Sequence, residues 1–403
     1  MSPRKRIAVL GSTGSIGRSV LSVVEANPDA FQIVSLSALT SAELLAEQAK
    51  QFGVTRVAIG EDAADAAALG DDLEVGVGEE ALVALASDPA ADLVVNALVG
   101  TAGLPVTAAA VEAGKKLAIA NKESLVMAGG LVTRLARQTG SELIPVDSEH
   151  SSIFRCLRGA AAGEVCGVVL TASGGPLRDT PLDEVRDADV AAVLSHPTWD
   201  MGEKITVDSA TLVNKAMEVV EAMWLFDLPL GKVDVVVHRE SVVHSFVQLR
   251  DGSLLAHLGT PDMRVPIQYA LFYPDAPGVS FDEFRPAEMG ALNFGPVEHE
   301  RYPCFELVLA SAREGGTAPT TAATADEVAV GAYLAGRLRF GDIATVIAGT
   351  LEAEGSGPAE DLAAIFEAER SARATATEIV DDIAGRSSRG PVGAARKSGH
   401  SGV

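Results

Sequence analysis

Short apolar runs alternate with longer segments of helical periodicity along the first part of the chain. The apolar runs predict strands at residues 7–10, 31–39, 56–59, 93–98, 117–120 and 142–146. The segments between them predict a helix ending near Asn27, helices at 41–52, 102–113 and 123–138, and an acidic helical tract before residue 93. Because strands that alternate with helices form parallel sheets, we expect an α/β fold with a doubly wound, Rossmann-like parallel sheet.

The pattern changes after residue 148. Strands are predicted at residues 164–171, 233–238, 242–249 and 253–258, and Asp251-Gly252 indicates a hairpin between the last two. A stretch rich in Pro and Gly follows, and helical periodicity then returns near residues 304–312, 325–334, 343–351 and 359–383. We therefore expect a central α+β unit that is largely antiparallel, then a linker and a C-terminal helical bundle.

One predicted helix combines an apolar stripe with polar residues suited to chemistry. Leu212, Ala216 and Val219 fall on one stripe, and Asn214, Lys215 and Glu218 project from the other side. Asp208 or Ser209 is the expected N-cap. The lysine would attract a phosphate and the glutamate would offer a hard oxygen to a divalent metal; alternatively, the helix has a solvated face with one Lys–Glu pair.

Composition and charge exclude several classes of protein. The formal net charge of −23 at pH 7 argues against nucleic-acid binding, which needs a basic surface. No run of 18 apolar residues occurs, so we expect a soluble cytoplasmic protein with no membrane partner. Cys156, Cys166 and Cys304 are widely spaced and odd in number, which fits reduced thiols better than a disulfide framework or a zinc site.

A glycine-rich segment follows the first predicted strand directly. Its spacing is G-x-x-G-x-x-G, and it leads into a helix, as in dinucleotide-binding folds where glycines allow the backbone to approach a pyrophosphate. The alternative is a simple turn. The expected cofactor-binding residues here are Gly11, Ser12, Thr13, Gly14, Ser15, Ile16 and Gly17.

The end of the second predicted strand bears on which dinucleotide is bound. It lacks the Asp or Glu that would bind a free ribose 2′-hydroxyl, which favours NADP over NAD. No basic residue occurs there either. The hydroxyls of Ser37, Thr40 and Ser41, or the nearby Arg56, would therefore have to contact the 2′-phosphate.

Polar residues follow three of the predicted parallel strands, at the sheet edge where ligands bind. They are Asn96, Asn121-Lys122-Glu123 and Asp147-Ser148-Glu149. Two carboxylates one residue apart can converge on one cation, because like charges that close need a cation or a proton between them. The alternative is a helix N-terminus that is simply rich in acids. We interpret His150 as structural.

Two further segments suggest substrate contacts. Ser173-Gly-Gly-Pro176 is a turn whose N–H groups and hydroxyl could contact an anion. Residues 195–202 are polar, contain Trp199 and Met201, and are flanked by Pro and Gly. They form either a loop with a buried Trp or a lid that closes over a substrate.

Nine motifs occur in one order between residue 11 and about residue 270. They are GSTGSIG, NALVG, ANKESL, PVDSEHS, TASGGP, HPTW, VDSATLVNKAMEV, VVVH and PDMRVPI. In these motifs, and in the linker and helical bundle that follow, the chain resembles the 1-deoxy-D-xylulose 5-phosphate reductoisomerase family. The DSEHS motif together with the Asn-Lys-x-x-Glu helix is highly specific.

The resemblance implies a two-step reaction in the non-mevalonate pathway to isoprenoid precursors. The family isomerises 1-deoxy-D-xylulose 5-phosphate to a branched aldehyde phosphate, by a retro-aldol and aldol route in the favoured description, and reduces it with NADPH to 2-C-methyl-D-erythritol 4-phosphate. A divalent metal, Mg²⁺ or Mn²⁺, would polarise the substrate carbonyl.

The resemblance also assigns roles to individual residues. The metal ligands would be Asp147, Glu149 and Glu218, a hard-oxygen set that suits these ions independently. The phosphate and neighbouring hydroxyls would contact Ser148, Ser173, His196, Ser209, Asn214 and Lys215, under a lid that contains Trp199 and Met201. The cofactor would also contact Thr40, Ser41, Asn121, Lys122, Glu123 and Gly202, and catalysis would involve Glu149, Lys122 and His196.

The resulting domain organisation has five parts. Residues 1–147 would form the NADPH-binding Rossmann-like domain and 148–275 the catalytic, metal-binding and dimerisation domain. The linker would span 276–302, the C-terminal bundle 303–386 and a disordered tail 387–403. The resemblance implies a homodimer formed through the exposed face of the second sheet.

The chain departs from the family pattern in its C-terminal part. Ala323-Thr-Ala-Asp326-Glu327 occurs where the family usually has Asn-Ala-Ala-Asn-Glu. Two other functions compete with a reductoisomerase. A phosphorylating semialdehyde dehydrogenase would need an activated Cys, whereas Cys156, the nearest candidate, is expected to be a core residue. A non-catalytic dinucleotide sensor would leave the carboxylates and the phosphate-binding residues unexplained.

Overall fold

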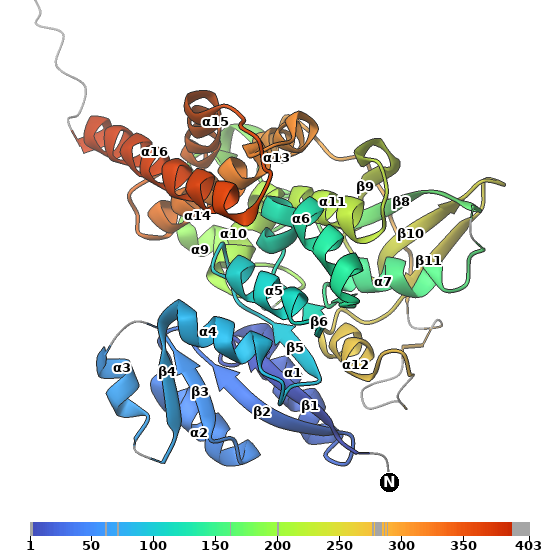
Figure 1. The fold of residues 1–403 in the computed structure, drawn as a ribbon. Coiled ribbons are helices and arrows are strands. Elements are labelled where there is room, and N and C mark those ends of the chain that lie inside the picture. Colours follow the sequence, from blue (N-terminus) through green and yellow to red (C-terminus); the bar gives the residue numbers. More distant parts are fainter. Residues whose placement is uncertain are drawn as a thin grey trace, which may run out of the picture.

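The computed structural model describes residues 3–388 except positions 61, 62, 71, 162, 200, 276, 277, 279–283, 286 and 288. Of the predicted disordered tail, residues 389–403 lie outside the described residues. Figure 1 shows a strand-rich N-terminal part at one end of the molecule, a second sheet beside α7, and the C-terminal helices at the opposite end.

The N-terminal part contains a seven-stranded sheet in the order β4-β3-β2-β1-β5-β6-β7. All its strand pairs are parallel. The strands are β1 (Lys5–Leu10), β2 (Phe31–Ser37), β3 (Arg56–Ile59), β4 (Glu74–Val77), β5 (Leu93–Asn96), β6 (Lys116–Ile119) and β7 (Leu143–Pro145). The predicted doubly wound sheet is confirmed, with the short edge strand β4 added.

Helices cover both faces of this sheet. They are α1 (Ser15–Ala26), α2 (Ala42–Phe52), α3 (Ala63–Ala68), α4 (Gly78–Ser87), α5 (Gly103–Glu112) and α6 (Glu123–Thr139). Ile7 and Val9 of β1 belong to one buried cluster, together with residues of α1 and α2. Ala8 and Leu10 belong to the other, with residues of α4, α5 and α6. Both faces of the central strand are therefore buried, as expected of a parallel sheet.

The central part contains a second, mixed sheet in the order β11-β10-β8-β9. β8 (Val165–Ala172) and β9 (Val233–Val237) are parallel, whereas β10 (Val243–Leu249) pairs antiparallel with β8 and with β11 (Leu254–Leu258). The connections contain α7 (Ser148–Leu157), α8 (Leu182–Val185), α9 (Val190–Leu194), α10 (Glu203–Thr211), α11 (Val213–Leu225) and the 3₁₀ turn η1 (Leu230–Lys232). α7 packs on β10 and β11, and α11 packs on β8 and β9.

The predicted N-cap of the Asn-Lys-x-x-Glu helix was wrong. Leu212 has a φ of 57° and separates two helices, so α11 begins at Val213. Asp208 lies inside the preceding helix α10, where its carboxylate binds Lys204 instead of backbone N–H groups. Ser209 also lies within α10 and faces the cavity described below.

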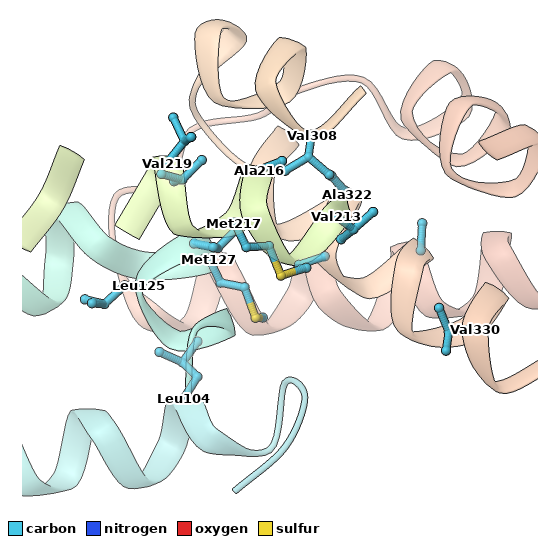
Figure 2. Close-up of a cluster of buried hydrophobic side chains, with 14 of the residues drawn as sticks. Leu104, Leu125, Met127, Val213, Ala216, Met217, Val219, Val308, Ala322 and Val330 are labelled. Atoms are coloured by element: carbon cyan, nitrogen blue, oxygen red, sulfur yellow. The ribbon is translucent and has the colours of Figure 1, made fainter. Parts of the chain in front are cut away.

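The C-terminal part packs on the buried side of α11. α12 (Arg264–Phe272) precedes the linker and packs on α1, and α13 (Pro303–Glu314), α14 (Ala318–Leu334), α15 (Asp342–Glu354) and α16 (Leu362–Ser388) form the bundle. Figure 2 shows Met127 of α6 and Met217 of α11 packed together, with Val308 of α13 and Ala322 of α14 nearby. With one side of α11 packed in this way, Asn214, Lys215 and Glu218 on another side line the cavity described below. No helix in the described part of the chain is long and apolar enough to cross a membrane.

Candidate active site

A cavity of about 510 Å³ lies where the two sheets meet. The N-terminal domain contributes Ser15, Ile16, Ser19, Ala120 and Lys122 to it, and residues 147–149 follow β7. The central domain contributes, among others, Ser173, Trp199, Met201, Ser209, Asn214, Lys215 and Glu218. Most of the residues that were predicted to contact substrate or metal therefore line one cavity.

The glycine loop has the shape that a dinucleotide requires. Gly11 has a φ of +86°, and a Cβ there would lie 2.6 Å from the carbonyl oxygen of Ala97. A Cβ on Gly17 would lie 2.2 Å from the carbonyl oxygen of Gly11. Because any side chain would disrupt this close packing, the loop fits the approach of a pyrophosphate to the start of α1.

Some residues of this region face the protein instead of a ligand. The buried hydroxyl of Ser12 donates to Gln48 Oε1 at 2.7 Å, and Ser37 Oγ accepts from the N–H of Gly11 at 3.0 Å. Arg56 forms ion pairs with Asp88 and Glu74. Ser37 is fully buried and Arg56 is paired with two acids, which argues against either as the main contact of a 2′-phosphate.

The polar residues after β5 and β6 divide into structural residues and one that faces the cavity. Asn96 Nδ2 donates to the carbonyl oxygen of Gly103 and to Thr107 Oγ1, both at 2.9 Å. Asn121 Oδ1 accepts from the N–H of Ser124 at the start of α6. Of these residues, only Lys122 lines the cavity.

Three carboxylates from distant segments converge in the cavity. One ligand oxygen from each of Asp147, Glu149 and Glu218 lies within 4.8 Å of the others. Asp147 is the N-cap of α7, where its Oδ1 accepts from the N–H of Glu149 at 3.1 Å. This cap fixes the first two carboxylates, while packing of α11 fixes the third. The set contains only hard oxygen donors, which suits Mg²⁺ or Mn²⁺.

Two lysines partly balance these acids. Lys122 Nζ lies 2.6 Å from Asp147 Oδ2, and Lys215 Nζ lies 2.5 Å from Glu218 Oε2 and 3.7 Å from Glu149 Oε1. Burial raises the pKa of Glu149 to about 8, although Lys215 opposes the rise. Burial alone would raise the pKa of Asp147 too, but Lys122 lowers it below its ordinary value. A divalent cation would stabilise all three carboxylates in their charged form.

His150 connects α7, at whose start Asp147 and Glu149 lie, with α11, which carries Glu218. This contact agrees with the structural role expected for His150. Its Nε2 lies 2.9 Å from the carbonyl oxygen of Glu218, and its Nδ1 lies 3.2 Å from Glu221 Oε2. The side chain is fully buried, and burial lowers its pKa to about 4. A neutral imidazole therefore joins α7 to α11.

A second group of polar residues, predicted to bind an anion, lines the cavity and is hereafter the anion-binding side. Ser173 lies before Gly174 and Gly175, and a Cβ on Gly175 would lie 2.4 Å from the carbonyl oxygen of Ser209. This close approach brings the hydroxyl-bearing Ser173 and Ser209 to the same cavity as Lys215. Asn214 Nδ2 donates to Glu218 Oε1 at 2.6 Å, so one residue connects the anion-binding side with the carboxylates.

His196 does not line the cavity but lies behind Ser173. Its Nδ1 accepts from the N–H groups of Thr198 and Trp199, at 3.1 and 2.9 Å. Burial and the nearby Arg178 lower its pKa to about 4, so the imidazole is neutral and its Nε2–H can donate to Ser173 Oγ at 3.1 Å. His196 thus connects the segment that contains Trp199 to Ser173.

The sequence did not reveal all residues of this region. The PDMRVPI motif, from which no site residue was predicted, supplies Asp262, Met263 and Arg264 to the cavity wall. Beyond the predicted residues of the cavity wall, Lys204 Nζ at the start of α10 lies 2.7 Å from Asp208 Oδ2, 3.0 Å from Asp326 Oδ2 and 3.4 Å from Glu123 Oε1. Lys204 and its three acids, hereafter the Lys204 cluster, join α6, α10 and α14. Lys204 and Asp208 are only four residues apart, but Glu123 and Asp326 come from distant segments, so no local signal predicts the whole cluster.

The fold and the cavity define a class of protein: a dinucleotide-binding oxidoreductase with a hard-oxygen cation site beside an anion-binding pocket. Three family models match, described as 1-deoxy-D-xylulose 5-phosphate reductoisomerase over residues 7–129, its C-terminal domain over 143–226, and the DXP reductoisomerase C-terminal domain over 258–375. The enzyme of Trichlorobacter lovleyi is 44% identical over 384 residues, which cover 94% of this chain and 98% of that protein. The chain belongs to the 1-deoxy-D-xylulose 5-phosphate reductoisomerase family.

Solved structures of this family have the same fold. The Zymomonas mobilis reductoisomerase in complex with NADPH has a TM-score of 0.85 and 37% identity, and covers 94% of this chain and all of its own. A reductoisomerase in complex with NADPH, fosmidomycin and magnesium has a TM-score of 0.89 and 36% identity, over 94% and 98% of the two chains. The predicted activity is confirmed, and a dehydrogenase with Cys156 as nucleophile is excluded. Burial also raises the pKa of that thiol.

Proposed function

We propose that Asp147, Glu149 and Glu218 bind the Mg²⁺ or Mn²⁺ ion of the reductoisomerase reaction. The convergence of their oxygens within 4.8 Å supports this proposal. When bound, the ion supplies Lewis-acid polarisation of the substrate's carbonyl and hydroxyl oxygens. Lys122 lies 2.6 Å from Asp147 and lowers the pKa of that carboxyl, and Lys215 places a second positive charge 2.5 Å from Glu218.

The substrate's phosphate and hydroxyl groups fit the opposite side of the cavity. Lys215 provides the positive charge, and Ser148, Ser173, Ser209 and Asn214 provide hydrogen bonds. His196, predicted as catalytic, is better assigned as a positioning residue that orients Ser173 through its Nε2–H.

NADPH would bind with its pyrophosphate at residues 11–17 and its nicotinamide near Lys122. The glycines that cannot accept a Cβ support the first placement, and Ser15, Ile16 and Lys122, which share the cavity with the carboxylates, support the second. Trp199 and Met201 also line the cavity, so the segment that contains them can exclude water from the hydride and the aldehyde.

The replacement of Glu218 by Gln tests the cation site. Gln keeps the size of the side chain but removes one charged ligand, so we expect NADPH to bind nearly as before while Mn²⁺-dependent oxidation of NADPH with 1-deoxy-D-xylulose 5-phosphate is lost. Glu314→Gln, at the exposed end of α13, is the matched control and should retain activity. Unchanged turnover in Glu218→Gln would remove this residue from the metal ligands.

We further propose that the chain forms a homodimer through the face of the second sheet that α7 and α11 leave uncovered. Leu254 and Leu258 of the edge strand β11 are 53% and 36% exposed, and Phe294 beside β10 is 47% exposed. Light scattering on Leu254→Asp should show a monomer, whereas Leu182→Asp, an equally large change on α8, should stay dimeric. A wild-type protein that is monomeric at micromolar concentration would refute the dimer.

Recovery of the protein from the cytoplasmic fraction of cells would test its predicted location.

A further inference from the structure

The turn after β2, where a 2′-phosphate of NADPH would lie, has no basic residue of its own. Leu39, Thr40 and Ser41 are exposed there. Ser37 and Arg56, the other candidates from the sequence, are engaged by Gly11 and by Asp88 and Glu74. A doubly charged phosphate at this turn therefore needs a cation from another element.

Arg18 is an exposed arginine in the first turn of α1. Its Nη1 donates to the carbonyl oxygen of Thr13 in the glycine loop at 2.7 Å. Among the residues that the structure describes, it forms no ion pair with a carboxylate. Its guanidinium is thus held at the loop by one hydrogen bond, with donors left over for an anion.

The packing of α1 against α2 shows which side of the loop Arg18 occupies. Arg18 and Glu25 are seven residues apart and so share one stripe of α1. Glu25 accepts a hydrogen bond from Gln51 of α2 at 3.2 Å, so this stripe faces α2. Ser15 and Ser19, on a different stripe, face the cavity.

The level of Arg18 along the helices follows from the same contact. Both helices start at the carboxyl edge of the sheet and run in the same direction, since their preceding strands are parallel. Glu25 and Gln51 lie near the ends of the two helices, so Arg18, in the first turn of α1, lies level with the first turn of α2. That turn begins directly after Thr40 and Ser41.

We propose that Arg18 binds the 2′-phosphate of NADPH, with Thr40 and Ser41 beside it, and so sets the preference for NADPH over NADH. This inference rests on the proposed use of NADPH. A guanidinium forms paired, charge-assisted hydrogen bonds with a phosphate, and these bonds are available only when the 2′-phosphate is present.

The test measures binding of fragments of the cofactor by calorimetry. 2′,5′-ADP contains the 2′-phosphate and ADP lacks it. In Arg18→Gln, we expect 2′,5′-ADP to bind roughly 10- to 100-fold more weakly, the range for charged hydrogen bonds, while ADP binds as before. Arg134→Gln, an exposed arginine on α6, is the control and should change neither affinity. In the steady state, kcat/KM should fall for NADPH and not for NADH.

The possible failures are distinguishable. If the wild type binds 2′,5′-ADP and ADP equally, the proposed use of NADPH fails. If the wild type prefers 2′,5′-ADP and Arg18→Gln keeps that preference, or binds both ligands equally more weakly, then Arg18 does not recognise the 2′-phosphate.

Discussion

Replacing Asp326 by Asn should stabilise the protein, and increasingly so as the pH rises. Asp326 belongs to the Lys204 cluster, in which one lysine faces three buried carboxylates. The Oδ1 atoms of Asp208 and Asp326 are buried and have no other hydrogen-bond partner in the described part of the chain. Burial raises the pKa of Asp208 well above its ordinary value, and burial raises that of Asp326 as well. We infer that these two carboxyls share a proton.

The magnitude follows from proton linkage. A carboxyl whose pKa is raised in the folded state stabilises the fold fully below its unfolded pKa of about 4, and this stability is lost as the pH rises towards the folded pKa. The loss is about 1.4 kcal/mol for each pH unit in this window. Asn at position 326 removes one such carboxyl and offers an N–H to Asp208.

Urea unfolding at a series of pH values between 5 and 8 measures this effect. We expect the advantage of Asp326→Asn over the wild type to be smallest at pH 5 and to grow with pH, by up to about 1.4 kcal/mol per unit. Asp183→Asn, an exposed change on α8, should shift stability by under about 0.5 kcal/mol at every pH. A variant that is less stable than the wild type at pH 8 would refute the shared proton.

Three further predictions test other parts of the site. Lys215→Ala should raise the KM for the sugar phosphate much more than it lowers NADPH affinity, because Lys215 is the cation on the anion-binding side. An unaltered KM in steady-state kinetics would contradict that role. Gly17→Ala should abolish NADPH binding, measured by fluorescence, because the new Cβ would lie 2.2 Å from the Gly11 carbonyl oxygen. Normal NADPH affinity would show that the backbone of the loop can move to accept the side chain. EDTA should stop NADPH oxidation and added Mn²⁺ should restore it, whereas the Cys156→Ala variant should stay active. Activity that survives EDTA but is lost in Cys156→Ala would favour a thiol mechanism.

The alternation of apolar runs and helical segments sufficed to predict six of the seven strands of the first sheet, because strands buried on both faces, such as β5 and β6, read as short apolar runs. β4 was missed because its sequence, EVGV, is short and lies at the edge. α14 begins at Ala318 and not at 325, since Pro and Thr in its first turns weaken the helical signal.

Prediction of the site was most reliable where local geometry determines it. Asp147 caps α7 and orients Glu149, and the apolar stripe of α11 determines the side from which Glu218 projects. The break at Leu212 was not predictable, because a leucine with positive φ is held by tertiary packing and has no local signature. The Lys204 cluster and the engagement of Arg56 likewise depend on contacts between segments far apart in the chain.

The meeting of Asp147 and Glu149 with Glu218 at one cation is tested most directly by Mn²⁺ binding, followed through the electron paramagnetic resonance signal of the free ion. We expect the NADPH-bound wild type to bind one Mn²⁺ per chain, Glu314→Gln to do the same, and Glu218→Gln and Glu149→Gln each to bind it much more weakly. Equal Mn²⁺ affinity in all four proteins would contradict a shared site.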